Sequence, residues 1–276
     1  MKALVVRYSA LGDVILAASV TGALGPVGFV TLPRYHALVR RFPGVVGVFG
    51  PGDTLPDLPI YDLHHSLRSR RLPATRRVER QDLRRRLRVW IKAPPADPVL
   101  TRYGRACGVT PAPLPWLPPV RRGDALIVAP GAAHATKRWP WFAALAARWD
   151  GPVRAIGGPG DEAALAPFGV VPDTGFAATL EALEGAAVLV GGDTGLLHLG
   201  AAVGVPVVGL FGPTTSADGF WSPGYGTAVE LPLSCRPCSR FGGAVCPIGD
   251  HACLRTLTVD AVLAAARRAA HGEGGA

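Results

Sequence analysis

The sequence predicts an α/β protein built from two parallel-sheet domains. Short apolar runs alternate with helical patterns along most of its 276 residues, as in strands joined by crossover helices. A chain of this length can form two ordinary cores. Between two such series lies a stretch at 110–124 whose prolines suit neither a helix nor an inner strand. We therefore place the boundary near Gly123, giving domains of 1–122 and 123–276.

The elements follow from the apolar runs in chain order. The first series is ALVVRYS at 3–9, a helix from about Gly12 to Leu24, VGFVTL, a helix near 34–41, VVGVFG and PIYDLH. The second is ALIVAPG at 125–131, helix 139–149, VRAIGG, a helix from Asp161, helix 178–186, AVLVGG, helix 195–204 and VPVVGLFG. Ligands of open parallel sheets bind off the carboxyl ends of the strands. We therefore expect the chemistry in the strand-to-helix turns.

The first such turn, SALGDVILA at 9–17, places Asp13 in the first turn of a helix. A carboxylate there stabilises the helix end by roughly 0.5–2 kcal/mol. It also stays ionised at neutral pH and can accept a proton from a sugar hydroxyl as a general base. The capping and general-base interpretations are compatible.

The matching turn of the second series, GGDTGLLHLG at 191–200, places Asp193, Thr194 and His198 around a helix start. Free N–H groups at a helix N-terminus bind phosphate, and Gly195 would let a ligand approach. A capping Asp or Thr and a core His are the alternative interpretation of these residues.

Two further turns of the second series offer polar groups. FGPTTSADG supplies glycine and hydroxyls, among them Gly212 and Thr214, and GGPGDE at 157–162 makes Asp161 or Glu162 available to a ribose hydroxyl. Neither a Walker loop nor a dinucleotide fingerprint occurs, since GxxxxGK[ST] and GxGxxG are both absent.

Four motifs of the chain, taken together, resemble those of a known family. SALGDVILA, HATKRWPWFAAL at 134–145, GGPGDE and GGDTGLLHLGAAVGVPVVGLFGPT at 191–214 are similar to motifs of the glycosyltransferase family 9 heptosyltransferases. The arginine-rich middle segment resembles the acceptor side of that family. The resemblance implies the GT-B fold, two Rossmann-like domains facing across a cleft, and transfer of heptose from an ADP-sugar to the lipopolysaccharide inner core.

The resemblance also implies roles for single residues. Asp13 would be the catalytic base and Lys137, one of three lysines, the cation beside the donor diphosphate. The donor would bind at Thr136, Lys137, Asp161, Glu162, Asp193, Thr194, Gly195, His198, Gly212 and Thr214. A lysine and helix N-termini can stabilise the leaving nucleotide of an inverting transfer without a metal, so no catalytic cofactor is expected. The chain is shorter than typical members, which leaves the sugar and the acceptor open.

The net charge of +9 predicts an acidic partner. Ten arginines and one lysine, against two acids, lie in 68–92. A solvated helix face is one interpretation. Docking onto an anionic glycolipid at the inner membrane surface is the sharper one, with Arg68, Arg70 and Arg71 as acceptor-binding residues. Nucleic-acid binding lacks a supporting motif.

Composition bears on the location of the protein. No apolar run is long enough to span a bilayer, and 1–20 read as a strand entering a helix rather than a signal peptide. We expect a cytoplasmic protein, possibly peripheral at the membrane's inner face. The chain has no Asn, one Gln and one Met, which fits a thermophile, although a GC-rich genome gives a similar bias.

Four of the five cysteines form the pattern C-x2-C-x7-C-x6-C in a Gly- and Pro-rich loop, at Cys235, Cys238, Cys246 and Cys253. Four thiols at this spacing can hold a structural zinc ion. Disulfides and reduced thiols are the alternatives. Cys107 lies outside this pattern, and we expect it to be a core residue.

Three function classes follow. The first is an inverting glycosyltransferase. The second is another GT-B nucleotide-sugar enzyme, such as an epimerase, which would need an acid and base pair but no acceptor surface. The third is a basic binding protein without catalysis, which the presence of Asp13 and Lys137 disfavours.

Overall fold

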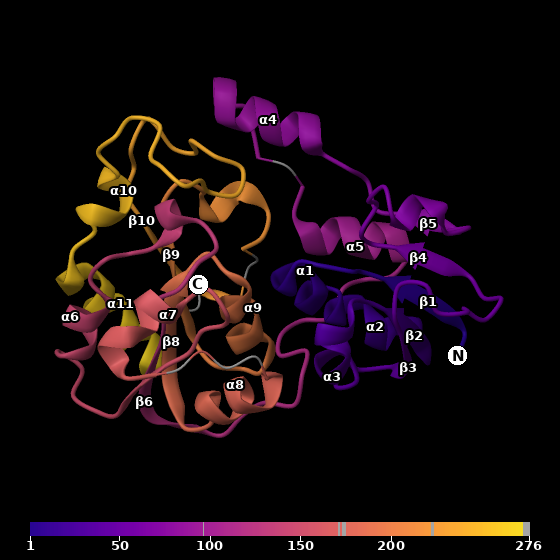
Figure 1. Cartoon of the computed structure of the whole chain (residues 1–276), viewed down its shortest axis with the longest axis horizontal. Helices are drawn as coiled ribbons and strands as arrows, with labels where there is room; N and C mark the ends of the chain where they lie inside the picture. Colours follow the sequence, from indigo (N-terminus) through magenta and orange to yellow (C-terminus); the bar gives the residue numbers. More distant parts are fainter. Residues whose placement is uncertain (96, 171, 173–174, 222–223, 273–276) are drawn as a thin grey trace.

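A computed structural model describes residues 1–272 except 96, 171, 173–174 and 222–223. It contains two parallel five-stranded sheets, one in each half of the chain (Figure 1). The predicted α/β fold class is therefore confirmed. No helix among the described residues is both long and apolar enough to cross a membrane.

The first sheet has the strand order β3-β2-β1-β4-β5. Its strands are β1 (Ala3–Val6), β2 (Val27–Val30), β3 (Val45–Phe49), β4 (Ile60–Asp62) and β5 (Arg76–Arg77). The central strand β1 pairs in parallel with β2, Ala3 lying beside Val27, and with β4, Leu4 beside Ile60. All four residues of β1 are buried, as expected for a strand covered on both faces.

The second sheet has the order β10-β9-β8-β6-β7. Its strands are β6 (Arg122–Ala129), β7 (Val153–Ala155), β8 (Ala186–Gly192), β9 (Val207–Phe211) and β10 (Gly226–Glu230). Every residue of β8 and β9 is buried. The two sheets thus occupy 3–77 and 122–230, and the exact domain boundary near Gly123 stays a prediction.

Helices cover both sheets and connect their strands. They are α1 (Leu11–Leu16), α2 (Ala18–Leu24), α3 (His36–Val39), α4 (Asp82–Ile91), α5 (Val99–Cys107), α6 (Phe142–Ala146), α7 (Glu162–Leu165), α8 (Phe176–Leu183), α9 (Gly195–Ala202), α10 (Ala252–Arg255) and α11 (Val259–Ala270). One buried apolar cluster contains residues of both halves, among them Val14, Ile15 and Leu199. The halves therefore share part of their core.

Several predicted helices are shorter in the structure. The helix expected from Gly12 to Leu24 is divided at Ala17 into α1 and α2. The hydroxyl of Ser19 bonds to the carbonyl of Leu16 at 2.7 Å, the kind of side-chain bond that perturbs a helix. The helix expected at 139–149 is reduced to α6, which begins two residues after Pro140.

The N-termini of α1 and α9 meet where the two halves face each other (Figure 1). A Cβ atom added to Gly12 would lie 2.6 Å from Cδ2 of His198, and one added to Gly195 would lie 2.8 Å from Cβ of Leu11. Only glycine allows this approach of the two backbones. The close contact brings the turn after β1 to the turn after β8.

The Gly12→Ala substitution tests this contact. We expect it to lower the free energy of unfolding by about 1–3 kcal/mol, because the added methyl must displace a packed imidazole. Urea unfolding measures the change. Gly158→Ala is the control, since a Cβ there meets nothing within 4 Å. Equal stabilities of the two variants would contradict the packing described.

Candidate active site at the domain interface

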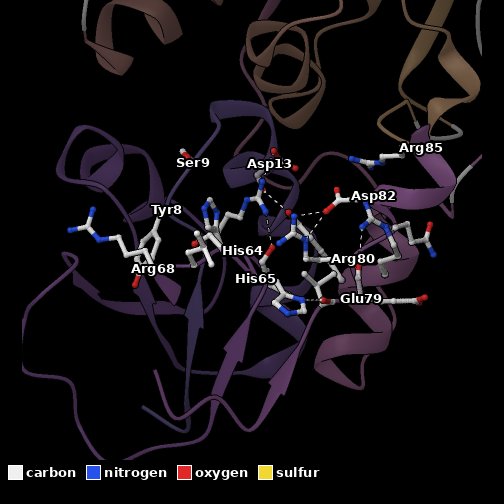
Figure 2. Close-up of a pocket in the computed structure, with 18 of the residues that line it drawn as sticks. Tyr8, Ser9, Asp13, His64, His65, Arg68, Glu79, Arg80, Asp82 and Arg85 are labelled. Carbon is white, nitrogen blue, oxygen red and sulfur yellow. Dashed lines mark hydrogen bonds and ion pairs between the residues drawn. The ribbon is translucent and has the colours of Figure 1, made fainter. Parts of the chain in front are cut away.

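Asp13 lies in the first turn of α1, as predicted, and faces a pocket of about 710 Å³. Its Oδ2 atom is 2.5 Å from Nη2 of Arg7, and the hydroxyl of Tyr103 donates to its backbone carbonyl at 3.4 Å. Figure 2 shows Asp13 on the side of the pocket nearest the ribbon of the second half. The ion pair with Arg7 orients the carboxylate.

Most of the pocket lining comes from the first half of the chain, and the second half contributes Phe220 and Phe241. Arg85 and Arg102 both line it. Nε and Nη2 of Arg85 and Nε of Arg102 are buried without a hydrogen-bond partner among the described residues. Burial lowers the pKa of both guanidinium groups, and the charge of Arg102 lowers that of Arg85 further.

These two arginines line the pocket with buried donors that have no partner among the described residues. Neither forms an ion pair with a described acidic side chain, although Arg102 donates to the carbonyl of Glu79 at 3.1 Å and Arg85 stacks over the ring of Phe220 at 4.7 Å. A buried cation without a counterion is costly. The pocket is therefore suited to an anionic ligand group.

His64 is a further polar group of this pocket, and its Nδ1 atom is buried without a partner among the described residues. Burial, followed by the charge of Arg7, lowers its pKa, so the ring is neutral at pH 7. Its backbone N–H and that of His65 donate to Oδ1 of the fully buried Asp62 at 2.9 and 2.8 Å. Asp62 thus fixes the loop that presents His64.

The predicted donor residues gather around the N-terminus of α9. Lys137 donates from Nζ to Oδ2 of Asp193 at 2.6 Å and to its carbonyl at 3.0 Å, and Thr214 donates to the same Oδ2 atom at 3.0 Å. Burial alone would raise the pKa of Asp193, but Lys137, then His198 and Thr214, lower it below its usual value. An ammonium group has three donors, so Lys137 keeps one for a ligand.

Thr194 precedes Gly195, and its hydroxyl is buried without a partner among the described residues. It makes no side-chain capping bond to α9. The helix N-terminus, the free hydroxyl and Lys137 therefore present donors at one place, which is the arrangement that binds phosphate.

His198 is buried beside the same turn, and its Nδ1 atom lies 3.0 Å from the hydroxyl of Tyr225. Burial lowers the pKa of His198 and raises that of Tyr225 well above its usual value. The imidazole is therefore neutral at pH 7 and packs across the interface against Gly12. His198 is therefore buried, as one of the two interpretations predicted, and it also contacts the turns that follow β1 and β8.

The other predicted donor residues lie in ordered turns. Thr136 donates to the carbonyl of Gly243 at 3.0 Å and accepts from its N–H at 2.8 Å, so its hydroxyl anchors the cysteine-rich loop. Asp161 accepts from Gly158 N–H and Glu162 from Gly160 N–H, each at 3.0 Å. The latter bond lowers the pKa of Glu162. Their predicted ligand contacts stay predictions.

The predicted acceptor arginines are divided by the structure. Arg68 lines the pocket and stacks over Tyr8 at 5.6 Å, as Figure 2 shows. Arg70 and Arg71 lie in an exposed 3-10 turn outside the lining residues. The sequence singled out neither Arg85, which is one of ten arginines in 68–92, nor Arg102, which follows that run, because only the tertiary structure separates buried arginines from exposed ones.

Arg236 is another residue that sequence reasoning missed. Its side chain is 5% exposed and donates to the carbonyls of Phe211, Gly212 and Thr214 at 3.1, 2.6 and 2.8 Å. It also pairs with Glu230 at 2.7 Å. These bonds hold the turn that carries Gly212 and Thr214, and their only signal in the sequence is the position of Arg236 inside the CRPC motif.

The four loop cysteines lie near enough to affect one another. Burial and the charges of Cys235 and Cys246 raise the pKa of Cys238, and burial with the other three raises that of Cys253 to about 11. However, no three His, Cys, Asp or Glu side chains among the described residues form a group that could hold a metal ion. The zinc site at these cysteines therefore stays a prediction.

The Lys137→Met substitution tests the buried ion pair. We expect it to lower the free energy of unfolding by about 1–3 kcal/mol at pH 7, because it leaves the Asp193 carboxylate buried without its cation. Burial then raises the folded pKa of Asp193 above its unfolded value of about 3.9. The deficit should therefore shrink as the pH falls from about 7 to about 5.

Urea unfolding at both pH values measures this deficit. Lys2→Met is the matched control, since it removes the same charge from an exposed residue. A deficit that does not change with pH would contradict the assigned pairing.

Comparisons with known proteins agree with this arrangement. The model of glycosyltransferase family 9 (heptosyltransferase) matches residues 109–241. A lipooligosaccharide heptosyltransferase 2 of Campylobacter jejuni is 33% identical over 76 residues, which are 27% of this chain and 23% of that relative. The chain thus matches less than a quarter of that relative's length.

Two solved structures show the same fold at low identity. The ADP-heptose lps heptosyltransferase II of E. coli has a TM-score of 0.70 and 19% identity, covering 99% of both chains. The iron-containing dodecameric glycosyltransferase TibC of enterotoxigenic E. coli has a TM-score of 0.65 and 16% identity, covering 98% of this chain and 76% of that one. The expected GT-B fold is confirmed. Residues 109–241 are similar to glycosyltransferase family 9 (heptosyltransferase).

Proposed function

We propose that this protein is an inverting glycosyltransferase. It transfers a sugar from an ADP-sugar to a lipopolysaccharide-core or related cell-envelope glycan, and the proposed sugar is heptose. The main support is that Asp13 and the α9 turn, which come from different halves of the chain, meet through the contact of Gly12 with His198. A carboxylate thereby lies next to a group of phosphate-binding donors. The E. coli relative named for ADP-heptose supports the choice of donor.

In the proposed reaction, Asp13 takes the proton from an acceptor hydroxyl. The hydroxyl oxygen forms a bond to the anomeric carbon as the bond from that carbon to the diphosphate oxygen breaks, and ADP leaves with the electron pair. The free donor of Lys137, the Thr194 hydroxyl and the N–H groups of α9 stabilise the negative charge that develops on the diphosphate. This chemistry needs no metal.

The acceptor binds in the pocket beside Asp13. Its anionic group, a phosphate or carboxylate of the glycan, pairs with the free guanidinium donors of Arg85 and Arg102, with Arg68 at the edge. Arg–carboxylate and Arg–phosphate pairs are among the stronger charge-assisted hydrogen bonds. The unpaired buried arginines support an acidic glycan over a neutral one.

The location is proposed from charge and acceptor. The protein acts in the cytoplasm, peripherally at the inner face of the cytoplasmic membrane, where a lipid-linked glycan would be available. Its basic surface serves this acceptor and does not bind nucleic acid. The arginine-rich segment and the net charge of +9 support this location.

Asp13→Asn tests the proposed base. Asn keeps the shape and capping ability of Asp, so the fold should survive, while turnover should fall by about 10²–10⁴-fold because general-base catalysis is lost. Transfer assays with purified acceptor glycan measure kcat. Arg7→Met is the matched control, since it breaks the same ion pair but leaves the carboxylate. Equal losses of kcat in the two variants would contradict the base assignment.

Binding of the donor provides a separate readout for the same variants. ADP and ADP-sugars should raise the melting temperature of the wild-type protein, and of Asp13→Asn equally, because a ligand that binds the native state stabilises it by mass action. Failure of every ADP compound to do so, with a response to another nucleotide, would contradict the proposed donor.

The zinc site also stays a proposal. One zinc ion per chain, bound by Cys235, Cys238, Cys246 and Cys253, would require these thiolates to move closer than they lie here. Its role would be to hold the loop, with no part in the transfer. Elemental analysis of protein purified without added metal should find about one equivalent of zinc. Because a similar structure is iron-containing, iron is measured alongside. Iron in place of zinc, or freely titrating thiols without metal, would contradict the proposal.

A further inference from the structure

Helix α4 and the loop 239–250 lie at the same end of the molecule, at the top of Figure 1. They come from different halves of the chain and are tied together. Nζ of Lys92, at the end of α4, donates to the carbonyls of Cys235 and Pro237 at 3.0 and 2.7 Å. Arg88 pairs with Asp218 at 3.3 Å. These contacts hold the end of α4 beside the residues that precede the loop.

Helix α4 has its apolar residues on the outside. Arg85 and Arg88 are half-buried toward the second half, whereas Leu83, Trp90 and Ile91 are 69, 77 and 70% exposed. Leu83 and Trp90 are seven residues apart and so lie on one helix face. An outward apolar stripe on a helix indicates that something covers it.

The neighbouring loop exposes apolar side chains of its own. Phe241, Val245 and Ile248 are 46, 77 and 60% exposed. We call these three residues, together with Leu83, Trp90 and Ile91, the docking face. Scattered single apolar residues need no explanation, but six on two adjoining segments at one end of a protein do.

The charges around the docking face are positive. Helix α4 carries four arginines and one aspartate. Arg84 shares Asp97 with Arg105 and Gln81, and Arg86 forms no ion pair with a described acidic residue. Arg240, in the loop, stacks over the ring of Phe241 at 5.3 Å. Exposed Trp and aliphatic residues flanked by arginines are typical of a helix that lies in a membrane interface.

We propose that the docking face binds the surface of an anionic lipid bilayer, with Trp90 and Ile91 inserted among the acyl chains. Phe241 belongs both to this face and to the lining of the pocket beside Asp13, and another residue of that lining, Leu67, is 80% exposed. The bilayer would thus lie at the mouth of that pocket. This inference rests on the proposed membrane-borne acceptor and assigns the surface that meets the membrane.

Vesicle sedimentation tests the proposal with the full chain. The probes are vesicles of phosphatidylglycerol mixed with phosphatidylethanolamine, and vesicles of phosphatidylcholine alone. Wild-type protein should sediment with the anionic vesicles and little with the neutral ones, and added salt should weaken binding. The double variant Trp90→Ser/Ile91→Ser should bind at least about tenfold more weakly, because two large apolar side chains no longer insert.

Matched variants separate the contributions. Val46→Ser is the control, since Val46 is 63% exposed on β3, away from the docking face (Figure 1). It should bind like the wild type. Arg86→Glu should weaken binding to the anionic vesicles only. Circular dichroism confirms that each variant is folded.

Three results would overturn the proposal. They are wild-type protein that binds neither vesicle, a double variant that binds like the wild type, and a concentration-dependent dimer that the double variant abolishes. The last would assign the face to a second copy of the chain. Transfer to a delipidated acceptor glycan and ADP binding should be unchanged in the double variant. If these activities are absent from wild-type protein while vesicle binding depends on Trp90, the proposed transferase function fails and the docking face stands.

Discussion

The approach of Gly12 to the α9 turn is the contact on which the site depends. Both turns follow central strands, β1 and β8, and both start helices whose N-termini point into the interface. A Cβ atom on either Gly12 or Gly195 would meet atoms of the other half within 3 Å. Because the backbones touch, Asp13 is held next to the residues that follow Asp193. If a layer of side chains separated these two backbones, the Asp13 carboxylate and the donors of the α9 turn would lie on two separate surfaces.

The two halves of the chain differ in whether their buried charged side chains have hydrogen-bond partners. In the second half, Asp193 is satisfied by Lys137 and Thr214, and Arg236 is satisfied by four carbonyls and Glu230. This closed network fixes the turns before any ligand arrives, which favours binding because little ordering remains to be done. In the first half, Arg85 and Arg102 keep buried donors unused. A charged ligand completes that part of the structure, so the pocket gains most from an anion.

Helix α4 joins these two features. Its inner arginines reach the pocket and Asp218, and Lys92 at its end reaches the loop that follows β10. The same helix therefore lines the pocket on one side and carries exposed apolar residues on the other. In the proposed function, positioning an acceptor and meeting a membrane are thus properties of one element, as the proposed acceptor, with a charged glycan and a lipid, requires.

The sequence by itself determined the α/β class, the two series of strands and the placement of Asp13 and Asp193 in strand-to-helix turns. These follow from local rules, since apolar periodicity and glycine positions depend on a few neighbouring residues. Helix lengths were less well predicted, because local side-chain bonds such as that of Ser19 to the Leu16 carbonyl interrupt a helix that apolar periodicity alone would continue.

Only the tertiary structure decided which polar residues face one another. Ten arginines in one run look alike in the sequence, yet Arg85 is half-buried in a pocket while Arg70 and Arg71 lie exposed. Likewise, no local pattern shows that the Thr136 hydroxyl bonds to Gly243, more than a hundred residues away. Burial and pairing are set by contacts between distant segments, and no local pattern records them. The sequence therefore identified the turns that hold the candidate site residues, whereas the packing of distant segments determined which charged side chains pair.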